Sequence, residues 1–266
     1  MSNRANVWRL YLLGNKNIIH EKRKLYFNNI ATFPYSISND INSIIKRDMP
    51  RTNFSGHPSL KEKESKVIES LLHQYCQIMP CDGYMQGFAY LMYILYNVYE
   101  KDNIEHIFPD TLWSFVTIVS IIRPMIPDHD PADYKIYTQK WQKYYMKHIK
   151  YKSKRTHMWL KPFYDIICPT LTVKWLMIWF TQTFPIKDIY KIWDAIITCV
   201  PDERTKLMAI IAANVTLQHA HSIENWARES PSEIGPKLLM CRAQDADVII
   251  EDSRQVMIRY KISIYK

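Results

Sequence analysis

Apolar residues recur every three to four positions along most of this chain of 266 residues, a spacing that predicts α-helices with one buried face. In the segment 59–78 the pattern begins where Ser59 and Glu62 have the spacing of a capping box, a reciprocal side-chain arrangement that starts many helices. Residues 88–99 are apolar on every face, which predicts a helix that is buried all round.

Capping residues and prolines set the bounds of the other predicted helices. Asp40 starts and Pro50 ends a short one, and Asp110 starts one that stops before residue 123. Asp130 followed by Pro131 predicts a long helix that reaches about residue 151. Further helices are predicted over 158–167, 171–183, 186–198, 202–224, 232–242 and 245–260. The predicted fold class is therefore all-α, with roughly ten or more helices.

Glycine is scarce: the chain has five, against the roughly 19 that average usage of about 7% would give. No segment matches G-x-G-x-x-G or G-x-x-x-x-G-K-[ST], the loops whose backbone amides hold dinucleotides and nucleotide phosphates. Turn-rich all-β folds, which use glycine in their hairpins, are also disfavoured. Two of the five glycines, Gly83 and Gly87, lie only four residues apart.

Cysteine usage and hydropathy favour a cytoplasmic protein. The five scattered cysteines form no C-x-x-C pair, which argues against a zinc site or a secreted disulfide framework and favours reduced thiols. The first 16 residues are too polar for a signal peptide. The apolar stretches 88–99 and 112–122 are shorter than the ~20 residues of a membrane span, so they are expected to be buried helices.

The net charge of +9 arises in one segment. Residues 134–164 contain nine Lys and Arg and no Asp or Glu, so the rest of the chain is formally neutral. On a helix, five lysines would share one face: Lys140, Lys143, Lys147, Lys150 and Lys154. The neighbouring stripe would be aromatic, with Tyr137, Trp141, Tyr144, His148 and Tyr151. Three interpretations are open. The aromatic residues pack on the domain while the lysines face water, the lysines contact acidic lipid, or the segment binds nucleic acid.

One candidate for chemistry is Arg51, which directly follows the proline that ends a helix. Its planar guanidinium offers five donors suited to phosphate oxygens, and Asp48 lies three residues before it, where a carboxylate could orient it. The alternative is an ordinary ion pair at a helix end on the surface.

A second candidate is Gln86, which lies between Gly83 and Gly87 at the start of the all-apolar helix. A carboxamide donates and accepts hydrogen bonds at once, as is required to orient a water molecule. The alternative is a turn that carries an incidental polar residue.

Together these segments resemble the TBC domain, the helical GTPase-activating domain for Rab-family small GTPases. The family signature I-x-x-D-x-x-R is matched by Ile45, Asp48 and Arg51, followed by the usual Thr52. The signature Y-x-Q-G is matched by Tyr84, Gln86 and Gly87, with the common preceding Gly83. These two short matches carry the catalytic part of the resemblance.

Further motifs match the family in order and spacing. Trp8 and Gly14 fall in a segment similar to the opening V-W-x-x-L-L-G element of the family. Trp175, Trp193 and Asp194 fall in a stretch similar to the W…F…P…WD region of the second half. The resemblance covers residues from about 4 to 250.

The resemblance implies a mechanism in trans on a GTP-loaded Rab. Arg51 would be the arginine finger and Gln86 the glutamine finger that positions the attacking water. Asp48 and Tyr84 would hold the fingers and contact the switch region of the GTPase, alongside Ile45 and Thr52. Gly83 and Gly87 would allow a close backbone approach.

The resemblance also implies what the chain does not bind itself. No cofactor or metal of its own is expected, because GTP and the magnesium ion belong to the partner GTPase. We expect a single TBC domain over 1–266, with a catalytic lobe 1–165 and a second lobe 166–266. The expected location is cytoplasmic, with peripheral membrane association through the GTPase. The main alternative is a TBC-like module that binds a GTPase or another trafficking protein without accelerating hydrolysis.

Two positions depart from the family pattern near the glutamine. Phe88 replaces the usual methionine after Q-G, and Met85 replaces the common cysteine or valine. Neither touches the finger chemistry, but Phe88 is expected to alter the packing of the partner's switch loop.

Overall fold

A computed structural model of the chain describes residues 4–30, 37–53, 60–81, 83–102, 104–126 and 130–262. The described residues fold into helices joined by short turns, which confirms the all-α prediction. Contacts divide the chain into an N-terminal unit, Met1–Arg123, and a C-terminal unit, Pro124–Lys266. The observed division, after residue 123, comes before the expected boundary at residue 165. The long helix that follows residue 130 packs within the second unit, not within the first.

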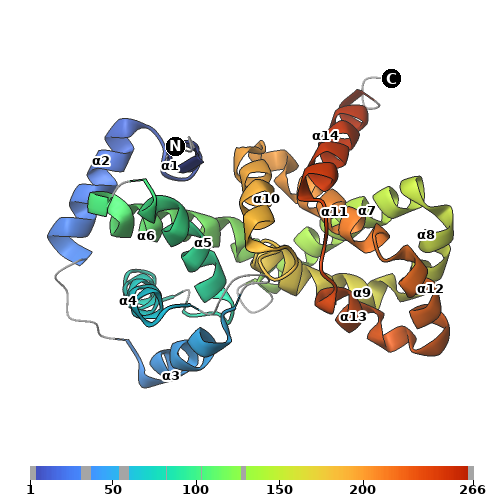
Figure 1. Cartoon of the computed structure of the whole chain (residues 1–266), viewed down its shortest axis with the longest axis horizontal. Helices are drawn as coiled ribbons and strands as arrows, with labels where there is room; N and C mark the ends of the chain where they lie inside the picture. Colours follow the sequence, from blue (N-terminus) through green and yellow to red (C-terminus); the bar gives the residue numbers. More distant parts are fainter. Residues whose placement is uncertain are drawn as a thin grey trace. The chain divides into compact units, whose positions relative to one another are not determined.

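The N-terminal unit is built around one central helix (Figure 1). Its helices are α1 (Arg4–Leu13), α2 (Lys16–Leu25), α3 (Asn39–Asp48), α4 (Glu62–Ile78), α5 (Phe88–Glu100) and α6 (Ile107–Ile122). Helix α5 packs against α1, α4 and α6, and every residue from Phe88 to Tyr99 is buried. The prediction of a helix buried on all faces is therefore confirmed.

The structure corrects the predicted start of α3 and shows a different first contact for α4. Helix α3 is capped by Ser38, whose hydroxyl accepts a hydrogen bond from the backbone of Ile41, so Asp40 lies inside the first turn. Helix α4 begins with the backbone of Lys61 donating to the Glu64 carboxylate at 2.9 Å. Ser59, the predicted cap, lies outside the described residues.

Asp110 is also predicted to start a helix, but α6 begins three residues earlier and the Asp110 side chain is fully buried. Its carboxylate accepts two hydrogen bonds from Arg23, at 2.8 and 2.7 Å, and one from Arg9 at 2.6 Å. Arg9 in turn donates to Asp102 at 2.5 Å. Burial disfavours the charged form of Arg9, but the hydrogen bonds and charges of the two aspartates outweigh it and raise its pKa. This ionic cluster ties α1 and α2 to α6.

The C-terminal unit surrounds α11 (Pro201–Leu217), which packs against α7 (Pro131–Lys152) and α14 (Ala246–Ile262). The other helices are α8 (Lys154–Leu160), α9 (Tyr164–Leu171), α10 (Ile186–Thr198), α12 (Ala220–Glu229) and α13 (Ile234–Met240). Helix α7 starts as predicted. Asp130 accepts hydrogen bonds from the backbone of Ala132 and Asp133, and Pro131 occupies the first helical position.

Three predicted helices of this unit are broken. The segment 158–167 is divided near Pro162 between α8 and α9. The segment 202–224 is divided between α11 and α12. The segment 171–183 forms one π-helical stretch and then turns, because Trp179 and Phe180 adopt left-handed backbone conformations with φ of 47° and 61°. Such conformations are rare for bulky residues and end a right-handed helix.

The basic helix α7 buries aromatic side chains on one face and exposes lysines on another. Trp141, Tyr145 and His148 are fully buried, and the ring of Trp141 stacks on that of Tyr145 at 4.8 Å. All five lysines of the predicted face are exposed, but only four lie on α7, namely Lys140, Lys143, Lys147 and Lys150. Lys154 begins α8, because α7 ends at Lys152. The predicted aromatic stripe is therefore only partly core, because Tyr137 and Tyr144 are half-buried and Tyr151 is exposed, and the lysine face is open to solvent.

Buried His148 makes stability depend on pH. Its Nε2 lies 2.7 Å from the amide oxygen of Asn214, which can only accept, so Nε2 donates. Burial, the largest effect, lowers the pKa of His148 below its ordinary value of 6.5. Burial also lowers the pKa of three other histidines: His73, His157 and His219.

We therefore expect the free energy of unfolding to fall as the pH drops below about 6.5, because the unfolded chain then binds protons that the folded chain does not. Urea denaturation at pH 7.5 and pH 5.5 measures this change. The His148→Gln variant should lose less stability between the two pH values than the wild type. An equal loss in both proteins would contradict the assignment to His148.

Candidate functional site

Arg51 is held at the surface by the turn that ends α3. A 3₁₀ turn, Met49–Arg51, follows the helix, with Pro50 inside it. Ile45 and Met49 anchor this segment in the core, whereas the Arg51 side chain is exposed. The local sequence thus fixes the backbone and leaves the guanidinium able to reach outward.

The buried carboxylate of Asp48 joins the arginine segment to the glutamine segment. Its Oδ2 accepts a hydrogen bond from the Tyr84 hydroxyl at 2.5 Å and another from the Gly87 backbone N–H at 2.8 Å. Within the described part of the chain, Asp48 makes no ion pair with Arg51. The carboxylate therefore does not orient the guanidinium directly, and it instead positions the two backbone segments.

Tyr84 is a donor in this arrangement. Burial, and then the hydrogen bond to Asp48, raise the pKa of Tyr84 far above its ordinary value of 10, so the hydroxyl stays protonated. The ring packs edge-on against Phe88, with centroids 5.8 Å apart.

The two glycines are needed for backbone conformation. Gly87 has φ of 101° and caps α5, and Gly83 has φ of 63°. Both values lie in the left-handed region that side chains disfavour. A Cβ atom at position 83 would meet nothing within 4 Å, so conformation and not crowding within the chain explains Gly83.

Tyr90 is a site residue that the sequence patterns do not single out. Its hydroxyl donates to the Arg51 backbone oxygen at 2.9 Å and accepts from the Asn53 backbone N–H at 3.3 Å. The buried Thr52 hydroxyl donates to the backbone oxygen of Asp48 at 3.2 Å. A tyrosine in a wholly buried helix needs a partner for its hydroxyl, and this is the only signal that could have pointed to Tyr90.

Arg51 and Gln86 line one surface depression of about 180 Å³, together with Ile44, Arg47 and Asp48. Gln86 is exposed, like Arg51, so both side chains can reach a molecule outside the chain. Arg47 adds a second guanidinium that sequence reasoning missed. Its Nε donates to the Ser43 backbone oxygen at 3.2 Å. The depression can therefore present two guanidinium groups and one carboxamide to an anionic group.

The other residues of the predicted site are structural. Trp8 is fully buried in α1, and Gly14 follows that helix with φ of 104°. In the C-terminal unit, Trp175 is buried, and Trp193 donates from its ring nitrogen to the backbone oxygen of Trp179 at 3.1 Å. Asp194 is half-buried on α10. None of these five lines the depression around Arg51.

Phe88 lies in the core, which corrects the expectation that it alters packing of a partner's loop. It is 1% exposed and packs edge-on against Tyr75 and Phe115, at centroid distances of 5.8 and 5.2 Å. A substitution here would act on the interior of the N-terminal unit.

The residues described around this site include no candidate group for a metal ion, and the nearby Cys76 thiol is buried. Across the described parts of the chain, no group of three His, Cys, Asp or Glu side chains is placed to hold a metal ion. Burial raises the pKa of the Cys76 thiol to about 12, so this nearby cysteine is not a nucleophile at neutral pH. Among the described residues, no helix combines the length and the apolar character that crossing a membrane requires.

Similarity to known proteins identifies the family of this chain. Residues 1–222 match the Rab-GTPase-TBC domain family. The chain belongs to this family. The curated TBC1 domain family member 13 of mouse and that of human are each 28% identical to it over 145 residues, which is 52% of this chain and 35% of those proteins. The chain thus matches about a third of the length of these relatives.

The fold is also similar to that of a solved structure, the Ypt/Rab-GAP domain of Gyp1p. The TM-score is 0.69 at 14% identity, and the match covers 99% of this chain and 89% of that one. An identity this low shows a common fold only. Family membership and the common fold confirm the resemblance to TBC domains.

Proposed function

We propose that the chain accelerates GTP hydrolysis by a Rab-family GTPase, with Arg51 and Gln86 acting in trans as two catalytic fingers. The observation that carries the proposal is that both exposed side chains line one depression, on segments joined by the buried Asp48. GTP and its magnesium ion belong to the partner, as the absence of glycine-rich phosphate loops in this sequence suggests.

Arg51 would stabilise the charge that develops on the transferring phosphoryl group. Its planar fork can donate two hydrogen bonds at once to phosphate oxygens. An arginine supplied in this way is worth about 10³–10⁵ in rate, or roughly 4–7 kcal/mol of barrier. The bond from Tyr90 to the Arg51 backbone restrains the point from which the side chain reaches out.

Gln86 would orient the attacking water, replacing the switch glutamine of the GTPase in that role. Its amide can accept a hydrogen bond from the water and donate another to a phosphate oxygen. Because Gly87 is fixed by Asp48 directly after Gln86, the amide starts from a defined backbone position.

The experiment that tests the proposal is a panel of GTP-loaded Rab proteins assayed for phosphate release with and without the purified chain. At least one Rab should hydrolyse GTP about 10³-fold faster or more. If the chain accelerates hydrolysis by none of the Rab proteins, the better account is a non-catalytic module that binds a GTPase or another trafficking protein.

Asp48 is expected to act as a positioning residue. Asp48→Ala leaves the Tyr84 hydroxyl and the Gly87 N–H without their acceptor, at a cost of about 1–3 kcal/mol, so the maximal rate should fall about 10-fold or more. In Asp48→Asn the side-chain oxygen can still accept both bonds, and most of the rate should return. Stopped-flow phosphate release at saturating concentration measures the difference. Equal activity of the wild type and Asp48→Ala would contradict the role.

We also propose peripheral contact with acidic membranes from a cytoplasmic location, through the exposed lysines of α7. The burial of Trp141 and Tyr145 leaves the lysine face at the surface, where a membrane can approach it. Each lysine near such a surface contributes about 1 kcal/mol. Sedimentation with phosphatidylserine vesicles should be lost when Lys140, Lys143, Lys147 and Lys150 are changed to Glu together. Steeply salt-dependent retention on RNA or DNA would favour the nucleic-acid alternative instead.

A further inference from the structure

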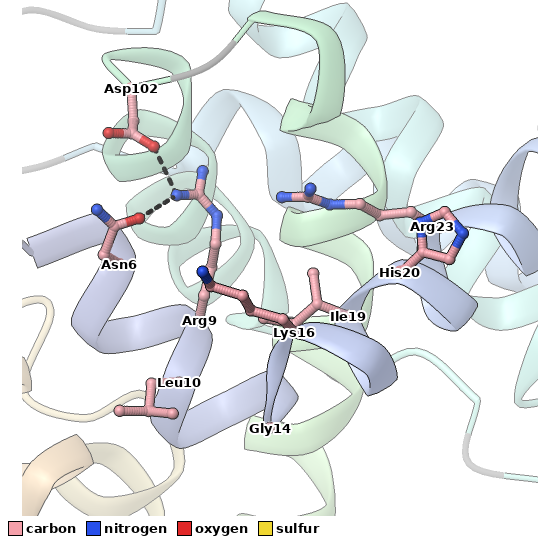
Figure 2. A pocket seen from close by; sticks show the side chains of 9 residues that line it. All are labelled: Asn6, Arg9, Leu10, Gly14, Lys16, Ile19, His20, Arg23 and Asp102. Atoms are coloured by element: carbon pink, nitrogen blue, oxygen red, sulfur yellow. Dashed lines mark hydrogen bonds and ion pairs between the residues drawn. The ribbon is translucent and has the colours of Figure 1, made fainter.

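A second depression, of about 650 Å³, lies in the N-terminal unit beside α1 and α2 (Figure 2). It shares no lining residue with the depression around Arg51. Four of its lining side chains carry or can carry positive charge: Arg9, Lys16, His20 and Arg23. Asp102 is the acidic residue among those that line it. A volume of this size is typical of sites for small molecules.

The charges of the ionic cluster cancel one another. Asp110 accepts from both Arg9 and Arg23, and Asp102 accepts from Arg9, so two guanidinium groups face two carboxylates. The Arg9 guanidinium also lies 5.1 Å from the centre of the Tyr99 ring. Arg9 therefore belongs to the structural wall of the depression, and Asp102 adds no uncompensated negative charge to it.

Lys16 supplies a charge that this cluster does not neutralise, and His20 lies one turn further along α2. They are exposed, and neither forms a hydrogen bond or ion pair with any residue that the structure describes. With Arg23 they occupy one face of α2, at positions i, i+4 and i+7. Figure 2 shows Lys16 and Arg23 reaching from α2 toward Arg9.

Arg23 is oriented for a ligand by Asp110. Its Nε and one terminal nitrogen, Nη2, are bound to the carboxylate, which fixes the plane of the guanidinium. Among the described residues nothing accepts a hydrogen bond from the remaining nitrogen, Nη1. The depression thus offers the Lys16 ammonium group and a held guanidinium nitrogen of Arg23, and the arginines of the cluster already compensate its two aspartates.

We propose that this depression binds a phosphate monoester group through Lys16 and Arg23, the two side chains that Figure 2 shows reaching from α2 toward Arg9. A phosphate monoester has three terminal oxygens, so it can accept hydrogen bonds from both donors at once. Hydrogen bonds between such charged partners are about twice as strong as neutral ones. The rest of the 650 Å³ leaves room for the remainder of a small ligand or a lipid headgroup. This inference does not depend on the fingers, because no residue of the two sites is shared.

The test uses the full chain and two sources of the same group. Calorimetric titration with glycerol 3-phosphate measures binding of a soluble monoester. Sedimentation with phosphatidylcholine vesicles that contain phosphatidic acid measures binding of a membrane monoester. Vesicles with phosphatidylglycerol, a phosphodiester lipid, control for general attraction to an anionic surface.

Lys16→Glu should weaken binding about 10-fold or more, because a hydrogen bond to a charged group is lost and a repulsion is added. The matched control is Lys24→Glu, an exposed lysine on the same helix that does not line the depression. Thermal melting of both variants checks that they fold. Selective loss in Lys16→Glu, with either source, supports the site and identifies the source. The absence of binding to both sources, or equal weakening by both variants, overturns the proposal.

Discussion

Replacing Arg51 by lysine is expected to lower the rate of GTP hydrolysis by a Rab in the presence of the chain about 10³-fold or more, nearly as much as replacing it by alanine. The charge remains in the lysine variant, but a single ammonium cannot reproduce the planar fork that bridges two phosphate oxygens. Arg51 is exposed and its guanidinium is not part of a buried contact, so the loss should not come from unfolding. Single-turnover hydrolysis with a matched Rab measures the effect.

The control for this experiment is Lys46→Ala, which removes an exposed positive charge from α3 outside the depression. It should change the rate by no more than a few-fold. If Arg51→Lys retained the wild-type rate, a simple electrostatic role would replace the bidentate finger. If Arg51→Ala retained it as well, Arg51 would have no role in catalysis.

The second large effect is expected in the ionic cluster of the N-terminal unit. Asp110→Asn keeps the shape of the side chain but removes a buried charge that receives three hydrogen bonds from two arginines. Breaking one side of such a buried pair costs about 3–5 kcal/mol of unfolding free energy. Urea denaturation followed by tryptophan fluorescence measures the loss.

An exposed ion pair provides the comparison. Glu62→Gln removes the partner of Lys66 on α4, where both side chains are mostly exposed, and should cost no more than about 1 kcal/mol. Asp110→Asn leaves the charge of Arg23 without its carboxylate. A double variant, Asp110→Asn with Arg23→Gln, removes that unpaired charge and should therefore recover part of the lost unfolding free energy. If Asp110→Asn cost as little as Glu62→Gln, the cluster would have no stabilising role.

The sequence is sufficient for the elements whose signals are local. The uniformly apolar run that forms α5 and the Asp130–Pro131 start of α7 lie where the pattern predicts them. The prediction that Asp110 starts a helix is wrong because its side chain binds Arg9, which is 101 residues away in the sequence. A local sequence pattern contains no information about so distant a partner. The predicted helix over 171–183 is wrong because tertiary packing holds Trp179 and Phe180 in conformations that their own preferences oppose.

The candidate site is predictable in its residues but not in its construction. Motifs single out Arg51 and Gln86, and only the fold brings them to the same depression. The sequence suggests that Asp48 orients Arg51, whereas the structure gives its carboxylate to Tyr84 and Gly87. The role of Tyr90 cannot be predicted from the sequence, because a tyrosine in an apolar helix gives no sign of which backbone group its hydroxyl will bind. In the structure that group is the backbone oxygen of Arg51.

The most direct test of the account is binding to a matched Rab in three states: GDP alone, GDP with aluminium fluoride, and GTP. Aluminium fluoride mimics the transferring phosphoryl group, so fingers that stabilise the transition state should favour that complex most. We predict tight binding of the wild-type chain to the aluminium fluoride state, little binding to GDP alone, and loss of the preference in Arg51→Ala and Gln86→Ala. Equal binding to all three states, unchanged in both variants, would contradict catalysis in trans and leave a binding module.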